Sequence, residues 1–556
     1  MENGHRPSCH RIGRIQLKIL FLLALTMVSS TLALAGQTVQ QRVDRVFDAY
    51  KRSTTPGCAL GVIRDGTFVY RKGYGAASLE LGVPLSAQSV FYMGSVSKQF
   101  TAASVVLAAE RGLLALDDDV RKYIPELPNY GETVTLRQML HHTSGFRDFL
   151  DLLELSGRSI LDKHSSDELI DLIARQKALN FKPGAEYLYS NTNYFLLAVV
   201  ISRVTKKPFS EFAAENIFRP LGMTHTRFYD DRTVVVPDRV PAYGSGSNGG
   251  FQVGWSTNYD IVGSGGLMSS VNDLLLWDQN FYKNRLGDSS FLREMQSRGV
   301  LNDGSQINYA LGLEVGSYRG LSVVEHNGAL MGYRTEILRF PEQRFTVVCL
   351  CNLANADPTA LAHQVADIYL EKSLQPMATE PQSVGYADDI SRFAGKYFNP
   401  VSHASISFAA AGDHLAWGRR PLRRIGDSRF QRLDGPIFDF DDTGAAMRVM
   451  GSYDNRPILV ADKLPALSVA ERDLADYAGT YESTELDATY QLGVDAGQLT
   501  LRNRWNPKLT LVPLVRDEFD TGGLGTLVFR RDANGRISGL SLFDDRIRNV
   551  VFDKIR

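Results

Sequence analysis

Residues 94–112 read GSVSKQFTAASVVLAAERG, a helical pattern that opens near Ser95 and ends at Gly112. A glycine at that position is typical of the residue just beyond a helix C-terminus. Ser95 and Lys98 form an S-x-x-K motif within it. Residues three apart on a helix share a face, so the motif predicts the Lys98 amine beside the Ser95 hydroxyl.

That pairing has a chemical meaning. A serine hydroxyl is a weak nucleophile near neutral pH and needs a neighbouring base. A buried lysine can lose its proton because desolvation disfavours the charged form. Taken alone, Ser95 also reads as a helix cap and Lys98 as a solvated surface residue.

A second motif, Y-x-N, lies at Tyr189 and Asn191, between the turn 182–184 and an apolar helical stretch. A phenol beside Ser95 would act as a general acid toward the leaving group, or as a base if its pKa fell. The Asn191 amide offers a donor and an acceptor that can orient Lys98 or a substrate amide. In isolation the two residues read as a loop tyrosine and a helix cap.

A third motif, His326-Asn327-Gly328-Ala329, follows the apolar run LSVVE and is therefore expected on a strand. A substrate can dock along such a strand edge through backbone hydrogen bonds. The N–H groups of Ala329 and Ser95 would then form an oxyanion hole, and Gly328 would keep the edge open. The alternative for His326 is a packing or surface histidine.

Composition narrows the function classes. The 556 residues carry 61 Lys and Arg against 62 Asp and Glu, for a net charge of −1. This balance excludes a broadly basic nucleic-acid binder. Neither H-E-x-x-H nor C-x-x-C spacing occurs, and the pair His141-His142 has no matching ligands nearby, so we expect no metal or other cofactor.

The N-terminus resembles a targeting segment. Basic residues precede the apolar run 19–28, and an A-x-A pattern ends at Ala35. This order predicts a signal peptide at 1–35, a periplasmic or secreted protein, and no stable membrane span after cleavage. A membrane anchor is the alternative, but the run is interrupted by serine and threonine.

Three cysteines remain after the predicted cleavage. Cys349 and Cys351 are two apart in a strand-like stretch and so point to the same face. With Cys58 the count is odd, which argues against a disulfide framework. We expect all three to be small buried apolar residues.

Residues 36–375 alternate helix-like and strand-like patterns, which indicates an α+β domain. Two strand patterns near 58–75 and three near 321–353 predict one antiparallel sheet built from both ends of this region. The helical stretches lie between them, at 97–111, 165–176 and 192–204.

The remainder is a polar linker at 376–384 followed by short strands and turns. FAGKY at 393–397 resembles YAGTY at 477–481, about 84 residues later. We therefore expect two small antiparallel barrels, at 385–468 and 469–556. One larger β-domain is the alternative, and the tail shows no catalytic cluster.

Together, the three motifs resemble those of penicillin-recognising serine hydrolases: class C β-lactamases, DD-peptidases, D-aminopeptidases and related esterases. LHHTSGF at 140–146, FRPLGM at 218–223 and GGLMSS at 265–270 are also similar. The resemblance covers about residues 40–370 and implies a β-lactamase/transpeptidase-like fold. With its repeated β-tail, the whole layout is most similar to that of a D-aminopeptidase.

The resemblance implies acyl transfer followed by hydrolysis. It makes Ser95 the acylated nucleophile, with Lys98 and Tyr189 sharing the proton transfers. It assigns the following residues to positioning and to the substrate strand: Asn191, His326, Asn327 and Gly328.

One departure shapes the predicted specificity. His326 stands where class C β-lactamases have a lysine, and a histidine is mostly neutral at pH 7. We therefore expect a peptidase on D-amino-acid peptides, of DD-carboxypeptidase or D-aminopeptidase type. A carboxylesterase or a β-lactamase with the same residues is the alternative, as is a non-hydrolytic sensor of β-lactams or peptidoglycan. The partner is then a small peptide, ester or β-lactam.

Overall fold

The computed structural model describes nine stretches of the chain. They are 38–246, 249–254, 260–376, 390–412, 414–418, 420–432, 436–453, 456–465 and 471–555. The predicted signal peptide and nearly all of the predicted linker lie outside the described residues. No helix in the described stretches is long and apolar enough to cross a membrane.

A six-stranded antiparallel sheet forms the centre of the first region, in the order β10-β11-β12-β13-β1-β2. The first strands in the chain pair with the last, because β1 lies directly against β13. This confirms the sheet predicted from both ends of the region. The strands are β1 (Cys58–Arg64), β2 (Thr67–Tyr74), β10 (Glu314–Tyr318), β11 (Leu321–Leu330), β12 (Tyr333–Phe340) and β13 (Phe345–Cys351).

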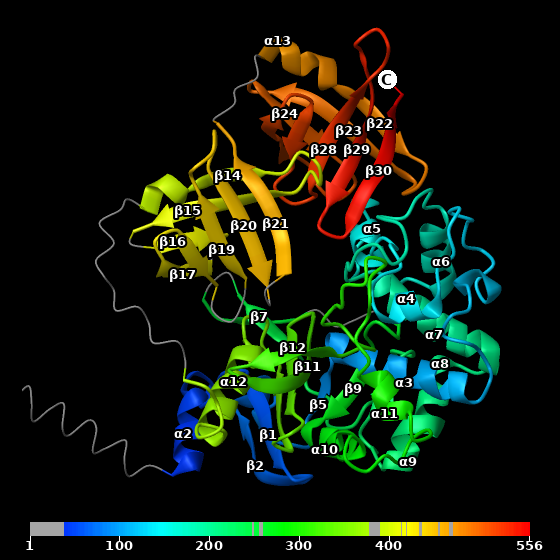
Figure 1. Cartoon of the computed structure of the whole chain (residues 1–556), viewed down its shortest axis with the longest axis vertical. Coiled ribbons are helices and arrows are strands. Elements are labelled where there is room, and N and C mark those ends of the chain that lie inside the picture. The colour runs from blue at the N-terminus through cyan, green and yellow to red at the C-terminus, as the bar shows by residue number, and fades with distance from the viewer. Residues whose placement is uncertain are drawn as a thin grey trace, which may run out of the picture.

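Helices cover the two faces of this sheet. On one face, α2 (Val39–Val46) and α12 (Pro358–Tyr369) pack over an apolar cluster of their own (Figure 1). The other face carries α3 (Ser97–Glu110) and α10 (Val271–Asn280). Along the chain, the helices between α3 and α10 are α4 (Leu136–Leu140), α5 (Phe149–Leu155), α6 (Ser166–Ala174), α7 (Asn191–Thr205), α8 (Phe209–Ala213) and α9 (Arg219–Leu221). Helix α11 (Phe291–Met295) follows α10.

Helix α3 is the central helix of this region. All but its last two residues are buried, as expected for a helix packed on every side. Gly112 follows it with φ of +69°, which confirms the predicted helix end. Short strands form separate small sheets: β3 (Ala76–Ser78) with β4 (Val83–Pro84), β7 (Tyr243–Ser245) with β8 (Phe251–Val253), and β9 (Leu267–Ser270) between β5 (Val90–Tyr92) and β6 (Arg227–Phe228).

The cysteine prediction is wrong in one respect. Cys58 and Cys351 form a disulfide across β1 and β13, and only Cys349 is a free, buried thiol among the described residues. The two cysteines face each other in the strand register although 293 residues separate them. Such a pairing depends on sheet topology, which spacing along the chain does not reveal.

The tail contains two β units, as predicted. The first is a closed eight-stranded barrel of β14 (Gly395–Phe398), β15 (Ser405–Ala411), β16 (His414–Trp417), β17 (Arg420–Gly426), β18 (Arg429–Gln431), β19 (Ile437–Asp441), β20 (Arg448–Tyr453) and β21 (Arg456–Lys463). We call it the first barrel. Its own apolar cluster fills the interior.

The second unit is a nine-stranded sheet in the order β25-β24-β23-β22-β30-β29-β28-β27-β26. Its two outermost strands, β25 and β26, follow each other in the chain, so the sheet nearly closes. After α13 (Glu471–Leu474) its strands are β22 (Gly479–Ser483), β23 (Ala488–Asp495), β24 (Gln498–Arg502), β25 (Leu509–Thr510), β26 (Val512–Val515), β27 (Glu518–Asp520), β28 (Thr526–Arg531), β29 (Ile537–Asp544) and β30 (Ile547–Lys554).

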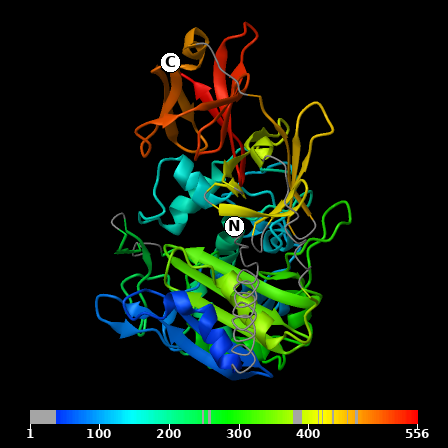
Figure 2. The same ribbon diagram turned by 90° about the vertical axis from the view of Figure 1, so that its left-hand side faces the viewer.

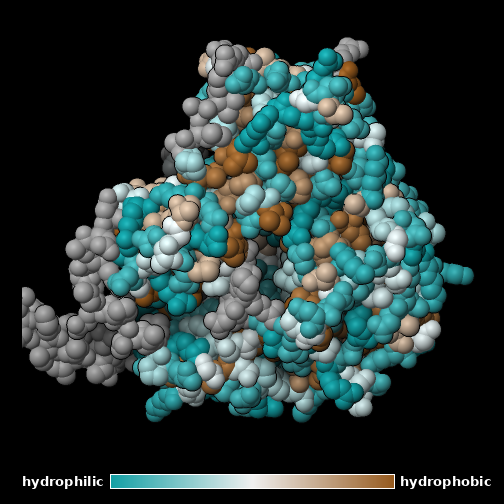
Figure 3. Space-filling view, turned by 45° about the horizontal axis from the view of Figure 1, so that its top comes forward, coloured by the Kyte–Doolittle hydropathy of each residue, from teal (hydrophilic) through white to brown (hydrophobic). Residues whose placement is uncertain are grey.

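This nine-stranded unit sits on the helices of the first region, beside α5 and α6 (Figures 1 and 2). Arg147 and Glu485 form a fully buried ion pair of 2.8 Å between them. The Tyr490 hydroxyl donates to the Leu155 carbonyl at 2.8 Å, and one apolar cluster runs through both parts. In the space-filling view, apolar residues gather around the hollow at the centre of the face shown (Figure 3).

Candidate active site

Ser95 lies in a short 3-10 turn, Gly94–Val96, that leads directly into α3. The Lys98 Nζ is 3.0 Å from the Ser95 Oγ, as the motif predicts. Nζ also donates to Asn191 Oδ1 at 2.9 Å and to the Ser264 carbonyl at 2.8 Å. The Lys98 nitrogen therefore contacts groups from three separate parts of the chain: Ser95, Asn191 and Ser264.

Burial decides the protonation of Lys98. Its side chain is fully buried, and this desolvation holds the pKa well below that of an exposed lysine; Asp148 opposes the shift and Arg546 adds to it. A neutral amine has two donors and one lone pair. The two carbonyl oxygens take the donors, so the lone pair is left for the Ser95 hydroxyl.

Tyr189 stands over the same nitrogen, with its ring centre 4.7 Å from Lys98 Nζ. Burial raises the pKa of its phenol, although a hydrogen bond with Ser95 and the charge of Arg546 act in the opposite direction. The phenol thus stays protonated near neutral pH, which favours a proton donor over a base. His142 packs against the ring with 4.2 Å between ring centres.

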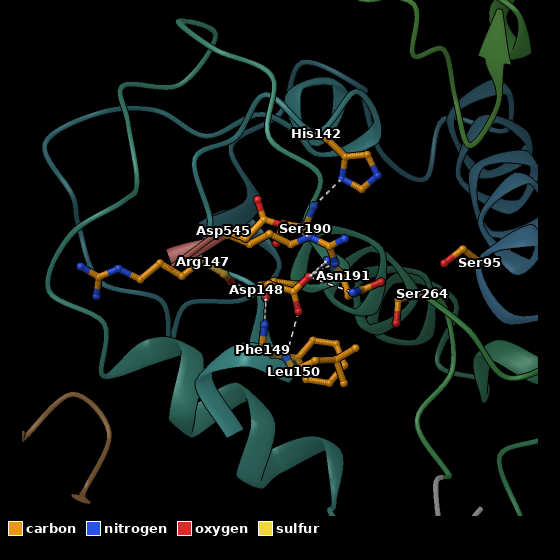
Figure 4. Close-up of polar contacts among 12 residues, drawn as sticks. Ser95, His142, Arg147, Asp148, Phe149, Leu150, Ser190, Asn191, Ser264 and Asp545 are labelled. Carbon is orange, nitrogen blue, oxygen red and sulfur yellow. Dashed lines mark hydrogen bonds and ion pairs between the residues drawn. The ribbon is translucent and has the colours of Figure 1, made fainter. Parts of the chain in front are cut away.

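Asn191 is the first residue of α7, and the N-cap position belongs to Ser190. The Asn191 amide therefore does not cap the helix. Its Nδ2 and its backbone N–H both donate to Asp148 Oδ2 at 2.8 Å. These two hydrogen bonds orient the Asn191 side chain so that its oxygen faces Lys98. Figure 4 shows Asn191 between Asp148 on one side and Ser95 and Ser264 on the other.

The predicted substrate strand is β11. Strand β10 pairs only with residues 321–325 of it, so among the described strands residues 326–330 pair with β12 alone. His326 is buried, with its Nε2 3.0 Å from the Tyr309 hydroxyl. Burial, and secondarily the charge of Lys98, lower its pKa to about 3, so His326 is neutral. Asn327 and Ala329 are exposed along the open edge.

Two glycines let this edge approach Ser95. A Cβ added at Gly328 would lie 2.1 Å from the Met93 carbonyl oxygen and 3.0 Å from the Ser95 nitrogen. A Cβ at Gly94, where φ is +54°, would lie 2.6 Å from the Ala329 nitrogen. Larger residues would push the backbones apart, so these glycines keep the Ser95 and Ala329 N–H groups close together.

A cavity of about 380 Å³ opens over Ser95. Of the eight residues predicted for the site, Lys98 and Gly328 are buried and do not line the cavity. The other six line it: Ser95, Tyr189, Asn191, His326, Asn327 and Ala329. The structure thus brings all eight together.

Three charged residues at this cavity were not predicted from the sequence. Arg546, from the turn between β29 and β30, lines it together with Glu314 from β10. Asp148, which is buried, holds Asn191 and lies 3.5 Å from Arg546 Nη1. No motif marks any of the three, and the placement of Arg546 depends on how the nine-stranded unit docks.

Metal ligands are scarce in the described stretches. The three sulfurs of Cys58, Cys349 and Cys351 lie within 4.8 Å of one another and form the one cluster of three ligand-type side chains there. Two of these sulfurs are consumed by the disulfide, so the cluster does not offer three thiolates. His141 and His142 are both buried, and burial lowers the pKa of both.

Comparison with known proteins agrees with this geometry. Residues 37–370 match the family described as beta-lactamase, over more than half of the chain. The chain belongs to this family. It is a serine hydrolase, and the fold is the expected β-lactamase-like region followed by β-barrel-like sheets.

Known relatives are similar over most of the chain. A D-aminopeptidase from Cereibacter sphaeroides is 28% identical over 453 residues, which is 80% of this chain and 83% of the relative. One from Brucella canis is 27% identical over 529 residues, covering 90% and 96%. The octameric penicillin-binding protein homologue from Pyrococcus abyssi has a TM-score of 0.56 at 21% identity, covering 84% and 98%, and so shares the fold.

Proposed function

We propose that the protein hydrolyses peptide or amide bonds in substrates that contain D-amino acids, through an acyl-enzyme on Ser95. The observation that carries this proposal is the trio of contacts around Lys98 Nζ, at 2.8, 2.9 and 3.0 Å. The similarity to D-aminopeptidases supports the substrate class.

The proposed reaction follows from these positions. The Lys98 lone pair takes the proton of Ser95, and Oγ attacks the substrate carbonyl, whose oxygen accepts hydrogen bonds from the Ser95 and Ala329 N–H groups. Tyr189 donates its proton to the leaving nitrogen and is reprotonated from Lys98. Water then attacks the ester carbonyl and gives one proton to the Lys98–Tyr189 pair. The pair passes this proton to Oγ as the ester bond to Ser95 breaks.

The neutral His326 weighs against the β-lactamase alternative. It supplies no positive charge at the strand, because burial lowers its pKa to about 3. The esterase alternative uses the same nucleophile, so substrate choice must be measured directly.

The test is a substrate panel with the wild-type protein and Ser95→Ala. It contains a D-Ala-D-Ala peptide, D-alaninamide, their L-isomers, p-nitrophenyl acetate and a cephalosporin, compared by kcat/KM. We expect the highest values on the D-peptide or D-amide and none above background for the variant. Preference for the ester alone would establish an esterase, and a burst that stalls after one turnover would establish a sensor.

We also propose a cellular location and domain boundaries for this protein. A periplasmic or secreted location is supported by the signal-like N-terminus and by the Cys58–Cys351 disulfide, since disulfides persist in oxidising compartments. The division at 36–375, 376–384, 385–468 and 469–556 is supported by separate sheets, but the second β unit shares its apolar cluster with the first region.

A further inference from the structure

Arg546 is the tail's contribution to the cavity over Ser95. It lies in the tight turn between β29 and β30, and its side chain is 35% exposed. Its guanidinium carbon is 5.1 Å from the centre of the Tyr189 ring. A cation from the last strands of the chain therefore stands beside the proposed proton donor.

The turn that carries Arg546 is anchored by several bonds. Asn180 donates to the Arg546 carbonyl at 2.9 Å and accepts from the Arg548 N–H at 2.8 Å. Arg147, itself paired with buried Glu485, donates to the Arg548 carbonyl at 2.9 Å. A side chain on so fixed a backbone is positioned before a ligand arrives, which reduces the cost of binding.

The guanidinium has donors to spare. Among the described residues it forms ion pairs with Asp148 at 3.5 Å and Asp545 at 4.0 Å and lies over the Tyr189 ring, and it makes no side-chain hydrogen bond there. Asp148 is already satisfied by two hydrogen bonds from Asn191 and one from the Leu150 N–H at 2.9 Å. The planar fork of an arginine is therefore left free for a ligand.

The neighbouring charged groups leave the Arg546 guanidinium accessible to that ligand. Asp148 is buried behind it, and Asp545 points into solvent with an 87% exposed side chain. Burial, followed by the charge of Asp148, raises the pKa of Asp151 to about 8, so that carboxyl is mostly neutral at pH 7. His326 is neutral as well, and burial lowers the pKa of Lys98.

We propose that Arg546 binds a carboxylate of the substrate, so that the nine-stranded unit completes the specificity site of the region that carries Ser95. This rests on the proposed function. Arginine matches a carboxylate with two parallel hydrogen bonds, a geometry that a neutral histidine on β11 cannot supply. The proposal gives the substrate a free carboxylate, as at the C-terminus of a D-peptide. The alternative specificity residue in this cavity is Glu314, whose carboxylate would instead bind an ammonium group of the substrate.

The experiment compares Arg546→Gln and Arg546→Lys with Arg548→Gln. Arg548 lies on the adjacent strand, pairs with exposed Glu186 and does not line the cavity, so it is a matched control. The substrates are N-acetyl-D-Ala-D-Ala, its C-terminal amide and p-nitrophenyl acetate. All are assayed on the plateau of the pH profile, and folding is checked by circular dichroism.

For the carboxylate peptide, we expect Arg546→Gln to raise KM at least about tenfold, the equivalent of one weakened charge-assisted pair. Arg546→Lys restores part of this loss. The amide and the ester change less than about twofold, and Arg548→Gln leaves all three unchanged. Equal losses on the amide and the carboxylate peptide, or no loss on either, would overturn the proposal.

Failure of the proposed function is separable from failure of this inference. If the wild-type protein cleaves the ester but neither peptide, N-acetyl-D-alanine is tested as an inhibitor of ester hydrolysis. Inhibition that weakens about tenfold in Arg546→Gln still supports carboxylate binding by Arg546. Absent or unchanged inhibition overturns it, as does a Glu314→Gln loss confined to D-alaninamide with no Arg546 effect.

Discussion

The two β units of the tail share a sequence repeat but differ in their relation to the rest of the molecule. In both, a tyrosine hydroxyl donates to a carbonyl four residues earlier: Tyr397 to Phe393 at 2.9 Å and Tyr481 to Tyr477 at 2.7 Å. The first barrel encloses its own apolar cluster, whereas the nine-stranded unit shares one with the catalytic helices.

Related sequences thus acquire different roles through docking. The nine-stranded unit places Arg546 at the cavity because its last hairpin packs against the catalytic region. The described contacts of the first barrel with the nine-stranded unit include an ion pair between Lys396 and Asp520 and a hydrogen bond between His403 and Glu518. A repeated fold alone therefore does not predict which copy serves the active site.

The largest effect is expected within the catalytic region and sets the scale for the tail. Lys98→Ala removes the proposed base, and because nucleophile and base act as a unit, acylation should fall at least about 10³-fold. Labelling by a fluorescent alkyl phosphonate measures this rate, and circular dichroism checks the fold. A near-normal acylation rate would show that Lys98 has only a structural role. A variant in the tail with an equal loss of acylation would show that the catalytic region and the tail do not differ in their effect on this step.

The next effect concerns the attachment of the nine-stranded unit. Arg147→Ala leaves Glu485 buried without its partner, which should cost about 3–5 kcal/mol of stability. Lys396→Ala, which breaks a partly exposed pair between the two β units, should cost less than about 1 kcal/mol. Urea unfolding, monitored by the loss of ester hydrolysis, compares the two variants. Similar losses would mean that the two interfaces are energetically alike.

The pH profile tests whether the docked unit reaches the chemistry. Burial lowers the pKa of Lys98, and the proposed base acts as the neutral amine, so kcat/KM on a neutral ester should fall about tenfold per unit of pH once the pH drops below that pKa. Arg546 contributes to the lowering, so Arg546→Gln should move this acid limb to higher pH. A limb that moves to lower pH would contradict the assignment, and Arg548→Gln should leave it in place.

The smallest effect compares one hydroxyl in each unit. Tyr490→Phe removes the bond to the Leu155 carbonyl and should cost about 1–3 kcal/mol, since a buried acceptor loses its donor. Tyr397→Phe removes a bond inside the first barrel. Thermal inactivation of ester hydrolysis should shift to lower temperature with Tyr490→Phe and stay unchanged with Tyr397→Phe. The reverse order would show that the first barrel, too, supports the site.

The sequence by itself determined the parts of the site that depend on short-range geometry. Ser95 and Lys98 meet because three residues span about one helical turn. The strand context of His326 also follows from a local pattern, because the apolar run LSVVE before it indicates a strand.

Only the tertiary structure decided the contacts between residues remote in the chain. The Cys58–Cys351 disulfide depends on β1 lying against β13, and the hold of Asp148 on Asn191 depends on how α5 packs beside α7. Arg546 reaches the cavity through the docking of an entire β unit. Such contacts arise from the packing of whole elements against one another, and no short motif encodes that packing.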